Sequence, residues 1–74
     1  MKNMTYNPDL FWQRIKDLLA MKNMTQVEFC RIMDFKVQNI KNKKLQKTYP
    51  SIVDCIRIAR FFGVSVEWLV TGEV

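Results

Sequence analysis

The chain has 74 residues, of which 49% are hydrophobic, and carries a net charge of +5. A chain of this length forms one domain and buries only about 60% of the surface that its unfolded form exposes, so its core has to be compact. The composition excludes a disordered protein, the apolar runs are shorter than the roughly 18 residues of a membrane span, and the start MKNMTYNPDL lacks a secretory signal. We therefore expect a globular protein of the cytoplasm with no membrane contact.

Groups that perform catalysis or bind metals are scarce in this sequence. It contains no histidine and no CxxC pair, and Cys30 and Cys55 both lie on helical patterns among apolar neighbours. We predict that the two thiols are small buried side chains rather than zinc ligands, a disulfide or a nucleophile. Gly63 and Gly72 form no phosphate-binding loop. We expect no enzymatic activity, no metal, no cofactor and no small-molecule substrate.

The N-terminal part of the chain is predicted to be a flexible arm followed by a helix. Residues 1–7 lack a periodic pattern, and Asn7 before Pro8 is a typical helix start, with Asn as the cap and Pro at the first helical position. The helix should run from Pro8 to Met21, with Trp12 half covered beside its apolar stripe. The side chains expected to face the core are Phe11, Ile15, Leu18 and Leu19.

A second helix is predicted from Thr25 to Met33. Thr25 and Glu28 have the spacing of a capping box, in which the side chain of each residue accepts a hydrogen bond from the backbone N–H of the other. The apolar face expected to be buried comprises Val27, Phe29, Cys30, Ile32 and Met33. Asp34 can adopt the left-handed conformation that ends a helix, and Phe35 should fill the space between this helix and the next.

The third helix is predicted at about residues 36–43, with a loop from Lys43 to Pro50. Val37 and Ile40 are three residues apart and should point inward. The polar side chains left facing outward are Lys36, Gln38, Asn39, Lys41 and Asn42. Two short helices joined by a turn of three residues are typical of a helix-turn-helix unit, and outward amides and lysines suit a DNA major groove.

Two more helices complete the predicted fold. Ser51 should cap a helix over Ile52–Phe62 that Gly63 ends, and Ser65 should cap a last helix over Val66–Val70. The inward stripe expected on the longer of these two helices comprises Ile52, Cys55, Ile56, Ala59 and Phe62. The predicted fold class is therefore all-α, a compact domain of five helices from residue 8 to residue 74.

Positive charge is concentrated beside the third helix. Five lysines and no acid occur between Phe35 and Pro50, at positions 36, 41, 43, 44 and 47. The cluster is either a solvated polar surface or a surface that neutralises phosphates. Tyr49 in the same segment either donates a hydrogen bond to a phosphate or packs against the fourth helix.

The planar amide of Gln38 matches the edge of adenine, so Gln38 is the first candidate for reading a base. Lys36 suits either a guanine edge or a phosphate. Val37 either meets a thymine methyl group or is a core residue, and Asn39 either reads a base or is only a polar residue at a helix start.

Several segments together resemble the Cro/C1-type (XRE family) helix-turn-helix domain, which is lambda-repressor-like. They are Thr25-Gln26, residues 34–40, Pro50-Ser51, and the run Ile58-Ala59 to Leu69 with Thr71-Gly72. Each piece is common by chance, whereas the ordered set at these separations is specific, and it covers residues 11–73. The resemblance implies a five-helix domain that binds double-stranded operator DNA as a homodimer and regulates transcription, most simply as a repressor.

The resemblance also implies roles for individual residues. Gln26 corresponds to the glutamine that contacts the DNA backbone and braces the recognition helix. Lys36, Val37, Gln38, Asn39 and Asn42 fall on the positions that reach base edges, whereas Lys41, Lys43, Lys44 and Lys47 are expected at phosphates. The sequence departs from the family pattern at Asp34, where Gly is usual, at Lys36, where a small hydroxyl residue is common, and after the third helix, where lysines replace Glu-Asn-Gly.

The C-terminal third has more apolar side chains than so small a core should cover, namely Val53, Phe61, Val66 and Trp68. An exposed apolar patch is typical of a partner interface, so we expect a two-fold dimer that uses Trp68 with Phe61 or Val66, unless these residues simply cap the core. The alternative to a DNA-binding regulator is a protein-interaction module, an antitoxin or an adaptor, on the same helical scaffold.

Overall fold

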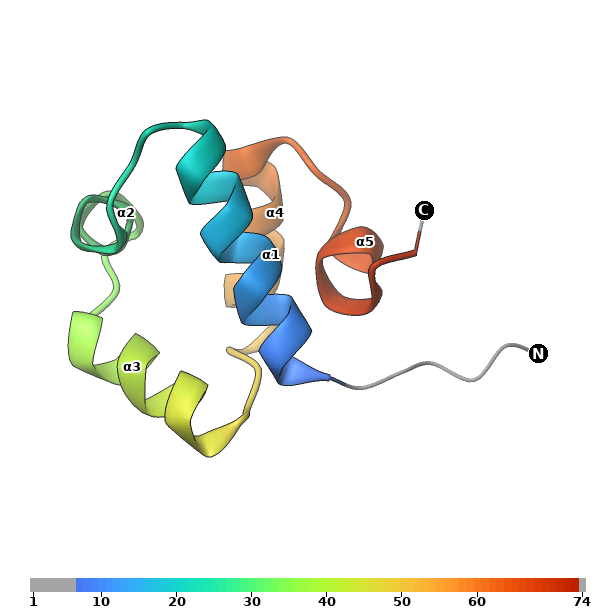
Figure 1. The fold of residues 1–74 in the computed structure, drawn as a ribbon, viewed down its shortest axis with the longest axis horizontal. Helices are drawn as coiled ribbons and strands as arrows, with labels where there is room; N and C mark the ends of the chain where they lie inside the picture. The colour runs from blue at the N-terminus through green and yellow to red at the C-terminus, as the bar shows by residue number, and fades with distance from the viewer. Residues whose placement is uncertain (1–6, 74) are drawn as a thin grey trace.

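The computed structural model describes residues 7–73, and these residues form five helices and no strand. The helices are α1 (Pro8–Met21), α2 (Gln26–Met33), α3 (Val37–Gln46), α4 (Ile52–Phe62) and α5 (Val66–Thr71). α1 lies in the middle of the molecule, with α4 behind it, α2 and α3 on one side and α5 on the other (Figure 1). The predicted all-α fold of five helices is confirmed, and the predicted arm lies outside the described residues except for Asn7.

Four of the five helices begin at the side-chain caps predicted from the sequence. The Asn7 side chain accepts from the Leu10 amide, and the capping box between Thr25 and Glu28 is complete. Ser51 and Ser65 each accept a hydrogen bond from the amide three residues later, at 3.1 and 3.0 Å. These caps satisfy amides that have no partner inside a helix, which is why local sequence alone places the helix starts well.

The core lies where α1, α2, α4 and α5 meet. Its fully buried side chains include Phe11, Phe29, Ile58 and Leu69, one from each of these helices. Trp12 was expected to be half covered, but only 6% of it is exposed. Its indole Nε1–H donates to the carbonyl of Thr48 at 3.0 Å, and this partner allows the ring to be buried without an unsatisfied donor.

The buried stripes of α2 and α4 are narrower than predicted. Val27 and Ile32 are 61% and 54% exposed, because they lie roughly 110° either side of the centre of the buried arc of α2. On α4 the prediction placed Ile52 and Ile56 inward, yet Ile52 in the first turn is 66% exposed and Ile56 is half-buried. Ile58 takes the central position instead, since it lies three residues after Cys55 and four before Phe62.

α3 is longer than predicted, because it continues through Lys43 to Gln46, where a loop was expected. These residues favour helix and carry no breaker before Pro50, although their apolar pattern is weak. Lys47 ends the helix in the left-handed conformation at φ +56, and the lysines of the last turn lie near the negative end of the helix dipole.

The turn before α3 has the predicted conformation. Asp34 is left-handed at φ +60. Phe35 is half-buried rather than enclosed, and its ring meets Phe29 edge to face with 6.0 Å between ring centroids. No helix within residues 7–73 combines the length and the apolar character needed to cross a membrane.

Candidate nucleic-acid interface

One buried and one half-buried side chain attach α3 to the rest of the domain. Ile40 is 4% exposed, and Val37 is half-buried and packs against the core. Val37 is therefore partly a core residue, which was one of its two predicted roles. Helical periodicity turns the rest of α3 to solvent, and its exposed residues are Gln38, Asn39, Lys41, Asn42, Leu45 and Gln46.

Gln38 and Asn42 form a pair on this outward side. They are one helical turn apart, and Gln38 Nε2 donates to Asn42 Oδ1 at 3.0 Å. The bond restricts both side chains and leaves the Gln38 carbonyl oxygen as an acceptor and the Asn42 amide nitrogen as a donor. An acceptor and a donor side by side are complementary to the edge of a base.

Lys44 lies inward of this face and links α3 to the start of α2. Its Nζ donates to Gln26 Oε1 at 2.7 Å and lies 5.8 Å from the centroid of the Trp12 ring. Burial lowers the pKa of Lys44, and repulsion from Lys16 and Lys41 acts in the same direction, whereas the Cys30 thiol opposes it. Two residues predicted to contact the DNA backbone, 18 positions apart, are therefore in direct contact.

The Gln26 amide points into the protein. Its Oε1 is bound to Lys44, and its Nε2 is buried without a hydrogen-bond partner among the described residues. A phosphate contact from this side chain therefore requires the amide to turn outward. The backbone N–H of Gln26 in the first turn of α2 is an alternative donor, because helix N-termini favour anions.

The other lysines near α3 differ in their exposure to solvent and in their ion pairs. Lys36 is exposed immediately before α3 and makes no side-chain cap, and Lys41 is exposed on the helix. Lys43 is half-buried. Lys47 lies 3.7 Å from the carboxylate of Asp9, and because both side chains are mostly exposed this ion pair contributes at most about 1 kcal/mol.

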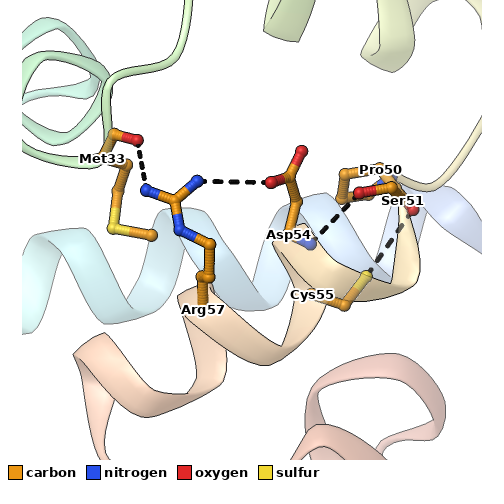
Figure 2. Close-up of polar contacts among 6 residues, drawn as sticks. All are labelled: Met33, Pro50, Ser51, Asp54, Cys55 and Arg57. Atoms are coloured by element: carbon orange, nitrogen blue, oxygen red, sulfur yellow. Dashed lines mark hydrogen bonds and ion pairs between the residues drawn. The ribbon is translucent and has the colours of Figure 1, made fainter.

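Arg57 of α4 holds the end of α2 in place (Figure 2). Its guanidinium donates to the carbonyl of Met33 at 2.7 Å and to Asp54 at 3.3 Å, and it lies 5.3 Å from the centroid of the Phe35 ring. A cation at this position stabilises the negative end of the α2 dipole. No local sequence pattern indicated that Arg57 supports the end of α2 and the turn before α3.

Tyr49 packs within the protein, which was one of the two alternatives, but it packs against α1 and not against α4. Its hydroxyl accepts the backbone N–H of Asn7 at 2.9 Å, and its ring meets Phe11 edge to face at 5.3 Å. The contact therefore joins the segment after α3 to the start of α1 rather than to α4.

The three residues expected at a dimer interface are partly covered within the chain. Phe61, Val66 and Trp68 are half-buried and pack against the core. Phe61 lies 6.0 Å from Phe29 between ring centroids, and Lys22 Nζ lies 5.4 Å from its ring. Each therefore presents only part of its surface to a partner. The large apolar side chains that are exposed among the described residues are Leu10, Met21, Val27, Ile32, Leu45, Ile52 and Val53.

Both cysteines are buried free thiols, as predicted, and burial raises the pKa of each. Residues 7–73 contain no cluster of three or more His, Cys, Asp or Glu side chains that could hold a metal ion. No protein-family model, curated protein or solved structure matches this chain.

Proposed function

We propose that this protein is a sequence-specific regulator that binds double-stranded DNA and inserts α3 into the major groove. The observation that carries the proposal is the outward side of α3, where the Gln38–Asn42 amide pair lies exposed beside Lys41 while Ile40 anchors the opposite side. An exposed polar helix with this set of donors and acceptors matches the chemistry of base edges.

Base reading falls to the N-terminal half of α3 in this proposal. Gln38, steadied by Asn42, makes two hydrogen bonds to adenine, worth roughly 1 to 3 kcal/mol of discrimination against another base. Asn39 and Lys36 lie beside them, and Lys36 takes a guanine edge or a phosphate. The exposed part of Val37 meets a thymine methyl group.

Phosphate contacts surround this centre. Lys41, Lys43 and Lys47 neutralise phosphates directly, and Lys44 acts beside Gln26 at the start of α2. Contacts of this kind give affinity without sequence preference and release counterions, so binding should weaken with salt. Asp34 carries the opposite charge beside this surface and reduces affinity unless it faces away from the DNA.

The biological unit we propose is a homodimer on a palindromic operator, which acts most simply as a repressor in the cytoplasm. Two copies that meet through Trp68 with Phe61 or Val66 would place two recognition helices about 34 Å apart along the DNA. The order of sequence segments that resembles the Cro/C1-type (XRE family) domain supports this arrangement. A light-scattering mass of one chain for the free protein, and of one chain per duplex for the DNA complex, would contradict the homodimer.

The test is a comparison of selected and random DNA. Duplexes selected from a random pool are titrated by fluorescence anisotropy at several salt concentrations. We expect Gln38→Ala to weaken binding to the selected duplex by roughly 1 to 3 kcal/mol and binding to random DNA hardly at all. Lys41→Ala should weaken both equally and reduce the salt slope by about 0.9.

Gln13→Ala is the matched control, since Gln13 is an exposed glutamine on α1 that donates to Asp17 and has no part in the proposed interface. It should leave both titrations unchanged. Equal losses for Gln38→Ala on both duplexes would refute the assignment of roles. Binding that does not depend on salt would instead favour the protein-interaction module, for which Val27 and Ile32 are exposed apolar side chains on two sides of α2.

A further inference from the structure

A pocket of about 470 Å³ opens to solvent between α1, α2 and α3. Figure 1 shows α2 and α3 on the same side of α1. The apolar lining residues of the pocket are Trp12, Ile15, Leu19, Ala20, Met24, Phe29 and Ile40. The volume lies in the range of small-molecule sites.

The polar side chains of the pocket are mainly hydrogen-bond donors. They belong to Gln26, Lys44 and Lys16. The only acceptor among these side chains, Gln26 Oε1, is already bound to Lys44, whereas Gln26 Nε2 is a buried donor without a partner. A buried donor in this state destabilises the folded protein. The lining side chains therefore offer donors and positive charge but no free acceptor for a ligand's own donors.

We propose that this pocket binds an apolar molecule that ends in one carboxylate, such as a medium-chain aliphatic acid. The apolar part lies against Ala20 and Met24, the apolar lining residues that are not fully covered, and the carboxylate accepts from Lys44 Nζ and, once the amide rotates toward the opening, from Gln26 Nε2. This occupant removes apolar surface from water, gives the unpaired amide a partner and places a negative charge beside a half-buried cation.

Binding of such a molecule would also regulate the DNA interface, a consequence that rests on the proposed function. Gln26 and Lys44 belong to both sites. A bound carboxylate neutralises Lys44 and holds the Gln26 amide at the pocket, so both contributions to phosphate binding are lost. The occupied protein should therefore bind DNA more weakly than the empty protein.

The direct test uses decanoate as the probe and decanol as its uncharged counterpart of equal chain length. In two-dimensional NMR of the intact protein, decanoate below its micelle concentration should shift the Trp12 Nε1–H and the Gln26 side-chain amide in a saturable manner. Decanol should bind at least about tenfold more weakly, because it lacks the charge-assisted hydrogen bonds.

Substitutions locate the site. Lys44→Met keeps the length of the side chain and removes its charge, and it should weaken decanoate binding about tenfold. Lys22→Met is the matched control, since Lys22 lies at the end of α1 and does not line the pocket, and it should leave the affinity unchanged. Ala20→Phe places a ring at an exposed residue of the pocket wall and should abolish binding in a protein whose thermal melt stays cooperative.

Three results would overturn the inference: no saturable shift, equal affinity for decanol and decanoate, or equal effects of Lys44→Met and Lys22→Met. The two proposals can fail separately. A protein that binds selected DNA but not decanoate retains the proposed function without this site. A protein that binds decanoate but no DNA retains the site without the function.

Discussion

α3 and α4 are of similar length but are attached to the domain in different ways. α4 buries Cys55, Ile58 and Ala59, whereas α3 buries only Ile40 among its ten residues. The remaining attachments of α3 are the half-buried Val37 and polar contacts such as that between Lys44 and Gln26. A helix held by so little apolar surface keeps most of its side chains available for a ligand.

The weak attachment of α3 affects how stable this helix is by itself. An isolated helix of about ten residues is marginal in water, so α3 depends on its neighbours for both its helical state and its position. The aromatic and aliphatic side chains of α1, α4 and α5 supply a rigid base. Substitutions on the buried side of α4 should therefore act mainly on stability, and substitutions at the attachments of α2 and α3 should act on binding as well.

The largest expected effect comes from Ile58→Ala compared with Ile40→Ala. Ile58 is completely buried, so its truncation should lower the free energy of unfolding by about 4 kcal/mol, measured by urea denaturation. The fraction that stays folded should bind DNA with unchanged affinity. Ile40→Ala should cost about 2 to 3 kcal/mol and also weaken DNA binding, because the anchor of α3 is lost. The same loss of affinity in both variants would contradict the comparison.

A smaller effect is expected at Arg57, which joins α4 to the end of α2. Arg57→Met removes the hydrogen bond to the Met33 carbonyl and the contact with the Phe35 ring. The free energy of unfolding should fall by about 1 to 2 kcal/mol. DNA affinity should fall too, since the angle between α2 and α3 becomes less restricted. Arg60→Met, an exposed arginine of the same helix, should change neither quantity.

Much of the fold could be predicted because its signals are local. The capping box of Thr25 and Glu28 and the left-handed Asp34 are determined by residues within one turn, and both are confirmed. Burial depends on which elements approach one another. Trp12 is covered because the Thr48 carbonyl accepts its N–H from 36 residues away, and Val27 is exposed because α2 is covered over a narrow arc.

In the candidate site, too, the local features could be predicted and the contacts with distant residues could not. Helical periodicity was enough to direct Gln38 and Asn42 outward once Ile40 was placed inward. It could not show that Lys44 turns toward Gln26, or that Arg57 reaches the Met33 carbonyl, because these partners are 18 and 24 residues apart. The prediction therefore found the exposed face of α3 and missed the polar contacts that hold the helix.

The smallest expected effect concerns the start of α2, where Gln26 lies. Hydrogen bonds from the backbone and side chain of Thr25 lower the pKa of Glu28, with a smaller contribution from Arg31. A carboxyl whose pKa is lower in the folded state stabilises the protein above its unfolded pKa of about 4.3. This stability is lost as the pH falls through the folded pKa.

Glu28→Gln tests this pH dependence, because it keeps an acceptor at the capping position but cannot titrate. The urea midpoint of the variant should therefore depend less on pH below about 4.3 than that of the unaltered protein. Thr25→Val removes the side-chain donor and should reduce the same dependence in part. If the urea midpoints of all three proteins changed with pH in the same way, the capping box would make no contribution to the loss of stability at low pH.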